Sequence, residues 1–183
     1  TDFSARSAVG VDLETNSLSA TKGRIIEYGS VVKNLNTGQV EEKIDSLHGI
    51  PEESKITLGA GKTDVHHISD QDIEGQDPFE SEHVQRKILN QLTNHGLMFA
   101  HNAKFEKQFL RAQLRGFAEA EARGDIYVVD TMAITKQCIP EAENNTMAEF
   151  TRVNGVKYEG AHRAFQDAEM MMDALGNFNK KNH

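Results

Sequence analysis

The chain has 183 residues, 38% of them hydrophobic and 26% charged, which is enough for one domain with a sizeable core and excludes a disordered, collagen-like or coiled-coil chain. The formal net charge of −8 counts against bulk electrostatic attraction to nucleic acid. It does not count against an enzyme whose acids gather around metal ions, because bound cations make such a site locally positive.

Cysteine usage and hydropathy bear on the cellular compartment. Cys138 is the single cysteine, so no intramolecular disulfide can form, which fits a reducing compartment. The sequence has no apolar run long enough to cross a bilayer, and we recognise no signal peptide in it. We therefore expect a cytoplasmic protein that has no membrane partner.

The N-terminal part of the chain predicts three strands joined by short turns. The runs 8–14, 24–32 and 39–47 are rich in β-branched and apolar residues, which is typical of strands. Between the second and third runs, residues 36–38 read Asn-Thr-Gly, a sequence that favours a hairpin turn. We therefore predict an antiparallel meander.

Beyond this meander, helical patterns alternate with short buried strands. Residues 49–76 lack periodicity and carry several glycines, which predicts loops with short helical turns. Apolar runs at 97–100 and 126–129 are typical of buried strands. Helical patterns cover residues 78–95, 103–118, 131–137, 146–154 and 163–178. Because this alternation favours parallel strands, we predict an α/β fold with a mixed five-stranded sheet, antiparallel at first and then parallel, flanked by helices.

Two carboxylates stand close together in the first predicted strand. Asp12 and Glu14 are spaced i, i+2, which puts both side chains on one face of a strand. The apolar Val9, Val11 and Leu13 then point to the other face. Two acids on a mostly buried strand are costly unless a cation lies between them, and oxygen ligands suit Mg²⁺ and Mn²⁺. The alternative is an exposed edge strand with two solvated acids.

Polar residues also follow the predicted parallel strands. His101 and Asn102 come directly after the strand 97–100, and Asp130 ends the next strand along the chain. Sites in open α/β sheets form at the C-terminal ends of parallel strands. We therefore expect three strand ends, including that of the first strand, to deliver polar groups to one edge of the sheet.

Two further acids lie about one turn into predicted helices. Glu106 is in the helix that begins at the sheet edge, and Asp167 is in the last helix. His162 stands five residues before Asp167, so the two do not share a helix face. We expect the histidine to reach the site from the loop before the helix, where Gly160 adds conformational freedom.

In order along the chain, these residues resemble the motifs of a known family, the DEDDh-type 3′→5′ exonucleases. This DnaQ-like group includes the proofreading subunit of bacterial replicative DNA polymerase. The resemblance covers nearly the whole chain, so we interpret residues 1–183 as a single exonuclease domain. It implies a ribonuclease H-like fold, which agrees with the predicted sheet. The matching segments are 12–15 (D-x-E-T), 24–29, 65–69, 100–106, 145–150 and 162–168.

The resemblance implies a two-metal hydrolysis of terminal phosphodiesters that releases nucleoside 5′-monophosphates. The acids that would hold the two divalent metal ions, Mg²⁺ or Mn²⁺, are Asp12, Glu14, Glu106 and Asp167. Asp12 would bridge both ions. His162 would deprotonate the attacking water, because an unperturbed imidazole pKa of about 6.5 suits a base near neutrality. These five residues form the candidate catalytic group.

Two places depart from the family pattern. Glu106 stands where the second motif normally has Asp, and Asn16 and Ser17 stand where Thr-Gly usually follows the first motif. The longer Glu106 side chain can still contact metal, directly or through water, so we expect activity to survive with altered metal preference. The alternative is a degenerate site that binds nucleic acid without cutting it.

The same resemblance names residues that would hold the substrate. The backbone near Thr15 and the side chain of Leu18 would meet the terminal nucleotide. Asn102 and Phe105 would contact its sugar and base, although Phe105 could equally belong to the core. His66 would approach the site by resemblance alone.

Basic residues recur at helical spacing in the segment that follows the second motif. They are Lys104, Lys107, Arg111 and Arg115. This spacing predicts one basic stripe beside the site, which could follow the phosphates of a nucleic-acid strand. The alternative is an ordinary solvated helix face.

The predicted partner is single-stranded nucleic acid, with DNA expected more than RNA and with unpaired 3′ ends included. Two alternatives stay open, an enzyme that trims RNA 3′ ends and a catalytically silent binding module. The sequence separates DNA from RNA poorly because the sugar contact is mostly backbone and shape. The resemblance also suggests association with a DNA polymerase.

Overall fold

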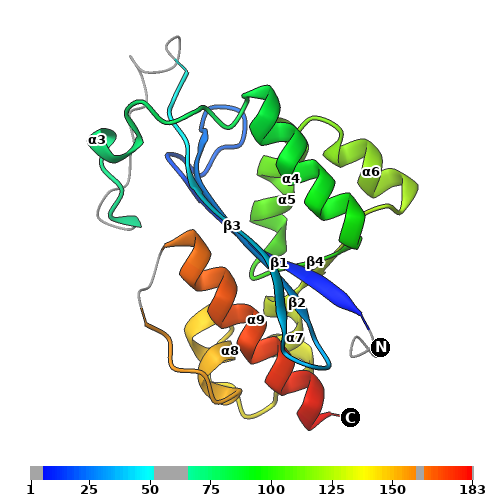
Figure 1. Cartoon of the computed structure of the whole chain (residues 1–183). Coiled ribbons are helices and arrows are strands. Elements are labelled where there is room, and N and C mark those ends of the chain that lie inside the picture. Colours follow the sequence, from blue (N-terminus) through cyan, green and yellow to red (C-terminus); the bar gives the residue numbers. More distant parts are fainter. Residues whose placement is uncertain (1–5, 52–65, 160–162, 183) are drawn as a thin grey trace.

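The computed structural model describes residues 6–51, 66–159 and 163–182. Within these ranges, five strands form one sheet in the order β3-β2-β1-β4-β5 (Figure 1). The strands are β1 (Ser7–Thr15), β2 (Ile25–Asn34), β3 (Val40–Leu47), β4 (Leu97–Ala100) and β5 (Tyr127–Asp130). β1 pairs antiparallel with β2 and β2 with β3, whereas β4 pairs parallel with β1 and with β5. The predicted mixed sheet is therefore confirmed.

Helices cover both faces of this sheet (Figure 1). The described helices are α3 (Asp70–Ile73), α4 (Glu82–His95), α5 (Ala103–Gln113), α6 (Phe117–Arg123), α7 (Thr131–Cys138), α8 (Met147–Val153) and α9 (Ala164–Lys181). The helices α4, α5 and α6 lie on one side, and α7, α8 and α9 lie on the other. This layering follows from the parallel β1–β4–β5 half of the sheet, whose crossovers place helices on its faces.

The central strand β1 is buried on both faces, and its alternating side chains enter two different cores. Val9, Val11 and Leu13 pack in the core beneath α4 and α5. Ala8 packs in the second core together with Met172 of α9. The alternation predicted from the sequence is therefore confirmed, and an exposed edge position for this strand is excluded.

One predicted helix is wrong in its C-terminal part. The pattern over residues 103–118 predicted a single helix, whereas α5 ends at Gln113 and a separate helix, α6, begins at Phe117. Between them Leu114 is extended and Gly116 has a φ of +88°. Residues other than glycine adopt this backbone conformation only at an energetic cost. The apolar spacing continues through the buried Leu114, so the hydrophobic pattern does not mark the break.

The segment predicted as loops with short helical turns contains α3. Its N-terminus is capped by Ser69, whose hydroxyl accepts the N–H of Asp72 while the Asp72 carboxylate accepts the N–H of Ser69. Residues 52–65 of this segment lie outside the described residues. In the described parts of the chain, none of the helices is both long enough and apolar enough to cross a bilayer.

Candidate active site

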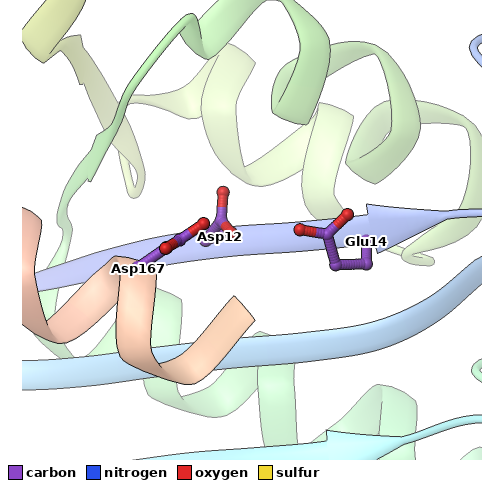
Figure 2. Close-up of side chains that lie close together, drawn as sticks. All are labelled: Asp12, Glu14 and Asp167. Carbon is purple, nitrogen blue, oxygen red and sulfur yellow. The ribbon is translucent and has the colours of Figure 1, made fainter. Parts of the chain in front are cut away.

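Three carboxylates from two elements meet toward the C-terminal end of β1 (Figure 2). Asp12 and Glu14 come from β1, and Asp167 comes from the first turn of α9. Each residue offers a carboxylate oxygen, and these oxygens all lie within 4.8 Å of one another. The structure thus brings together three of the four acids that were named from the sequence.

The close approach of α9 to the sheet depends on a glycine. At Gly29 of β2, a Cβ atom would lie 2.3 Å from the backbone nitrogen of Phe165 and 2.4 Å from the carbonyl carbon of Ala164. Such contacts are too short to exist, so a larger residue would push the start of the helix away from the sheet. Asp167 lies within the first turn of this helix, so the packing at Gly29 places its carboxylate beside Asp12.

Burial and crowding make this cluster unfavourable for free carboxylates. Asp12 has 8% of its surface exposed, and burial raises the pKa of its carboxyl well above the usual value. The charges of Glu106, Asp167 and Glu14 raise it further. Burial, followed by the charges of Asp167 and Glu27, raises the pKa of Glu14 to about 8. Near neutral pH such groups either take up protons or require a cation.

The fourth predicted acid, Glu106, lies beside this group of three. It is in the first turn of α5 and has 3% of its surface exposed. Burial is the largest cause that raises the pKa of its carboxyl, and the charges of Asp130 and Glu14 add to that effect. The charge of Glu106 in turn raises the pKa of Asp12. The longer side chain that replaces the usual Asp is therefore electrostatically part of the cluster.

Two buried oxygens show that the cluster fits a divalent cation. The Oδ2 atom of Asp12 and the Oε2 atom of Glu106 are buried, and neither has a hydrogen-bond partner among the described residues. A buried carboxylate without a compensating partner is costly. A divalent cation would supply the missing positive charge, and carboxylate oxygens are the ligands that Mg²⁺ and Mn²⁺ prefer. The residues present therefore fit such an ion.

The polar residues after β4 and β5 brace this edge of the sheet. The Nε2 of His101 donates to the carbonyl oxygen of Asn145 at 2.7 Å, and its Nδ1 lies 2.8 Å from the hydroxyl of Thr131. The Oδ1 of Asp130 accepts the backbone N–H of Asn102 at 2.9 Å and also caps α7. These residues were predicted to lie at the edge of the sheet where the parallel strands end, and the structure places them there. Their polar atoms hold the turn between β4 and α5.

Asn102 and Phe105 flank the start of α5. Asn102 is exposed and has a φ of +66°, a left-handed conformation that asparagine tolerates better than most residues. Phe105 is partly buried, and its ring packs on that of Phe109 with the two centroids 5.0 Å apart. Phe105 therefore contributes to the core and still presents part of its ring at the surface.

The other three predicted substrate contacts differ in exposure. Leu18 has 66% of its surface exposed. Thr15 is buried, and its hydroxyl donates to the carbonyl oxygen of Ser17 at 2.7 Å. His66 is buried, and its Nδ1 accepts the backbone N–H of Ile68 at 3.0 Å. Thr15 and His66 thus stabilise local turns, whereas Leu18 offers an apolar side chain to solvent.

Two predicted features fall on residues 160–162, outside the described residues. They are His162, the candidate base, and Gly160 in the loop before the last helix. The described chain resumes at Arg163, immediately before α9. The assignment of His162 as the base therefore stays a prediction from the sequence.

The four basic residues of the predicted stripe do not line one continuous groove. Lys104, Lys107 and Arg111 line a hollow of about 380 Å³ between α5 and β5, whereas Arg115 lines a separate hollow beside α4. Lys107 and Arg111 also form ion pairs with Glu121 of α6, at 3.4 and 2.7 Å. The basic character next to the candidate site is thus concentrated at the start of α5.

Sequence reasoning missed one charged group beside the cluster. Glu27 lies on β2 and has 1% of its surface exposed. Its charge raises the pKa of both Asp12 and Glu14. The available signal was a single acid between apolar residues at the start of the second predicted strand, because a buried charge requires a partner.

Comparison with known families identifies the class of protein that this fold and site define. The RNase_T family model, described as Exonuclease, matches residues 9–175. The chain therefore belongs to this exonuclease family. The recognition of a DEDDh-type 3′→5′ exonuclease with a ribonuclease H-like fold is confirmed.

Two curated bacterial proteins illustrate the sequence relationship. The chain is 30% identical over 172 residues to the PolC-type DNA polymerase III of Lacticaseibacillus paracasei. It is also 30% identical over 165 residues to the 3′-5′ exonuclease DinG of Bacillus subtilis. These alignments cover 92% and 88% of this chain but 11% and 16% of the two relatives. The chain therefore spans a small part of each relative's length.

Solved structures with low sequence identity share the fold. The nuclease domain of 3′hExo, a DEDDh family member bound to rAMP, has a TM-score of 0.72 at 12% identity, covering 99% of this chain and 95% of that one. The zinc-bound form of the E. coli ExoI complex with single-stranded DNA has a TM-score of 0.73 at 14% identity, covering 97% and 41%. These two likenesses extend over nearly the whole chain.

Proposed function

We propose that the chain hydrolyses terminal phosphodiesters of single-stranded DNA or of unpaired 3′ ends and releases nucleoside 5′-monophosphates. The observation that carries this proposal is the cluster of Asp12, Glu14 and Asp167, whose oxygens lie within 4.8 Å of one another in a member of an exonuclease family. Free acids would repel a phosphodiester. The cluster therefore suits this substrate only when cations neutralise it.

Four acids would hold two divalent metal ions. Asp12, Glu14 and Asp167 offer oxygens close enough to bind one ion together. Glu106, which lies beside them, would help to hold a second ion. We assign Mg²⁺ or Mn²⁺ because all four donors are carboxylates. When bound, the two ions supply positive charge that stabilises the attacking and leaving oxygens of the phosphoryl group.

The proton of the attacking water would pass to His162. An unperturbed imidazole has a pKa of about 6.5 and can therefore accept a proton near neutrality. The four acids are poorly suited to this task because their oxygens would be engaged as ligands. His162 stands immediately before Arg163 in the sequence, and the residues from Arg163 onward bring Asp167 to the cluster.

The terminal nucleotide would be held at the ends of β1 and β4. The exposed Leu18 and the partly exposed ring of Phe105 offer apolar surface for its base. The exposed Asn102 would contact its sugar, and the backbone near Thr15 would complete the contact on the β1 side. His66, which is buried, would approach the site, as the family resemblance implies.

The basic hollow along α5 would receive the phosphates that precede the terminal nucleotide. Lys104, Lys107 and Arg111 line it, and Glu121 offsets part of the charge of the last two. Because the chain as a whole carries a net charge of −8, a strand would approach most readily where positive charge is concentrated.

We propose DNA rather than RNA as the substrate because a curated relative that is 30% identical to this chain is named as a PolC-type DNA polymerase III. The same PolC relationship supports association with a DNA polymerase. We further propose that residues 1–183 act as one exonuclease domain in the cytoplasm.

Digestion of matched DNA and RNA oligomers, labelled at either end, tests this proposal. With Mg²⁺ or Mn²⁺, we expect a 5′-labelled single DNA strand to shorten stepwise and a 3′-labelled strand to release its label at once as a mononucleotide. A chelator should stop both reactions. Failure to form product with any divalent metal would favour the silent binding module, and faster digestion of RNA would favour the RNA-trimming enzyme.

A further inference from the structure

A buried carboxylate on β2 holds the start of α9. The Oε2 atom of Glu27 accepts hydrogen bonds from Nε and Nη2 of Arg163, at 2.9 and 2.7 Å. Its Oε1 atom accepts the backbone N–H of Ala164 at 2.7 Å. Both carboxylate oxygens are thus engaged, and together they bind the residue before the helix and the first residue within it.

These contacts fix the turn that carries Asp167. The first N–H groups of a helix have no partner within the helix and carry partial positive charge, so the Glu27 carboxylate satisfies one of them and complements the helix dipole. The backbone N–H of Asp167 donates to the carbonyl oxygen of Arg163 at 3.0 Å. Arg163 and Asp167 therefore belong to one hydrogen-bonded turn, and holding Arg163 holds Asp167.

Stability alone is a poor explanation for this arrangement. Replacing an ion pair that has a buried member with well-packed apolar residues is often neutral or stabilising, and in this pair the Glu27 side chain is 1% exposed while that of Arg163 is 42% exposed. A second ion pair, between Lys33 and Asp173, joins the same strand and helix further along. The attachment of α9 to β2 therefore does not depend on Glu27 alone. At the first turn of α9, which packs closely on Gly29, Glu27 supplies the hydrogen bonds from β2 to Arg163 and Ala164.

We propose that Glu27, acting through Arg163 and the backbone of Ala164, is a positioning residue that holds Asp167 in the metal-binding arrangement with Asp12 and Glu14. This inference rests on the metal site proposed above. Glu27 itself uses both oxygens to hold α9, so it acts on the metal ions through Asp167.

Two matched variants separate positioning from simple attachment of the helix. Glu27→Gln and Asp173→Asn each convert a carboxylate into an amide in an ion pair between β2 and α9, one at the site and one beyond it. Mn²⁺ binding to the wild-type chain and to each variant, all spanning residues 1–183, is measured by isothermal titration calorimetry, alongside thermal unfolding of the metal-free form. Arg163→Lys is a third variant, which keeps the charge but cannot reproduce the two-nitrogen contact.

We expect Glu27→Gln to weaken Mn²⁺ binding by about 10-fold to 100-fold, the range seen when a group that orients a metal ligand is changed. Arg163→Lys should also weaken Mn²⁺ binding. This variant tests the proposal even if Glu27→Gln does not fold. Asp173→Asn should change the Mn²⁺ dissociation constant by less than about twofold, because Asp173 is half exposed and its pair contributes little.

Three results would overturn the inference. The first is wild-type Mn²⁺ affinity in folded Glu27→Gln or in Arg163→Lys. The second is an equal loss of affinity in Asp173→Asn, which would assign the effect to general attachment of α9. The third is a wild-type protein that binds no Mn²⁺, which would refute the proposed metal site and this inference with it, and which the wild-type titration alone reveals.

Discussion

The two ends of α9 meet the sheet in different ways. Beyond its first turn the helix packs apolar side chains, including Met172 and Leu175, into the core it shares with β1 and β4. At its first turn it brings Asp167 against two other acids. The part of α9 beyond the first turn, its core end, excludes water by ordinary close packing. The first turn, its site end, brings like charges together where little water reaches them.

The charged contacts of the two ends show what this difference means. At the core end, Lys33 pairs with Asp173, and the Asp173 side chain is half exposed. At the site end, buried carboxylate oxygens of Asp12 and Glu106 have no hydrogen-bond partner within the described chain. The core end is therefore arranged for stability, and the site end is arranged to be completed by a ligand.

Neutralising one acid should separate activity from stability most strongly. For Asp12→Asn we expect turnover to fall by more than about 10³-fold, because metal ions supply several kcal/mol of charge stabilisation and about 1.4 kcal/mol corresponds to a tenfold change in rate. The metal-free variant should unfold at the wild-type temperature or above it, because one of several mutually repelling buried acids is gone. Nuclease assays and thermal unfolding without metal measure the two effects.

The matched change at the core end is Leu175→Ala. Leu175 has 1% of its surface exposed, so truncating it should cost about 2–5 kcal/mol of stability and leave turnover per folded molecule unchanged. Full turnover in Asp12→Asn, or loss of Mn²⁺ binding in folded Leu175→Ala, would contradict the division between the two ends.

Removing the proposed base should reduce turnover while sparing the ligand site. In His162→Ala we expect turnover to fall by at least about 10²-fold, the lower range for a general base. Binding of Mn²⁺ and of a single DNA strand should persist, because the four acids are intact. Single-turnover cleavage and direct binding assays measure these quantities, and near-normal turnover would remove His162 from this role.

The pH dependence of the metal-free protein should expose the cost of the acidic cluster. The pKa of Glu14 is raised from 4.5 to about 8, so between these values the folded state retains a proton that the unfolded chain has released. The stability from this proton is fully present below about pH 4.5 and is lost as the pH rises through about 8. The unfolding temperature without metal should therefore fall from pH 5 to pH 8.

Saturating Mg²⁺ should remove this fall, because a bound cation takes the place of the proton and binds better as the carboxylates ionise. Asp173→Asn, which leaves the cluster intact, should follow the wild-type profile. A metal-free unfolding temperature that rises over the same interval would show that the cluster is not strained by its own charge.

Charge reversal in the basic hollow should have the smallest effect. Lys104→Glu should raise the KM for a single-stranded DNA oligomer with little change in kcat, and should lower the slope of log KM against log salt by about one for a lost phosphate contact. Arg115→Glu is the control, because Arg115 lines a different hollow. Equal effects of the two variants would show that the strand follows no particular path along α5.

Much of the fold could be predicted because its signals are local. The parity of Val9, Val11 and Leu13 predicted the buried faces of β1, and short apolar runs predicted β4 and β5. The break between α5 and α6 was missed because it depends on the left-handed conformation of Gly116, while the apolar spacing continues past it. A hydrophobic pattern reports which face is buried, and it reports backbone breaks only where a residue interrupts the spacing.

In the candidate site, too, local sequence patterns predicted some features and missed others. The i, i+2 spacing of Asp12 and Glu14 predicted a shared face, and motif order added Asp167, which the structure places beside them. The Glu27–Arg163 pair joins residues 136 positions apart, and no local period marks such a pairing. The position of Asp130 at the end of a predicted parallel strand likewise placed it at the correct edge of the sheet. It did not indicate that Asp130 would cap α7.

Electron paramagnetic resonance of Mn²⁺ is the most direct test of the central claim that these acids form a site completed by divalent cations. At two equivalents of Mn²⁺, we expect the wild-type protein to remove most of the signal of the free aqueous ion and Asp12→Asn to leave much of it in place. A wild-type protein that leaves the free-ion signal unchanged would contradict the account.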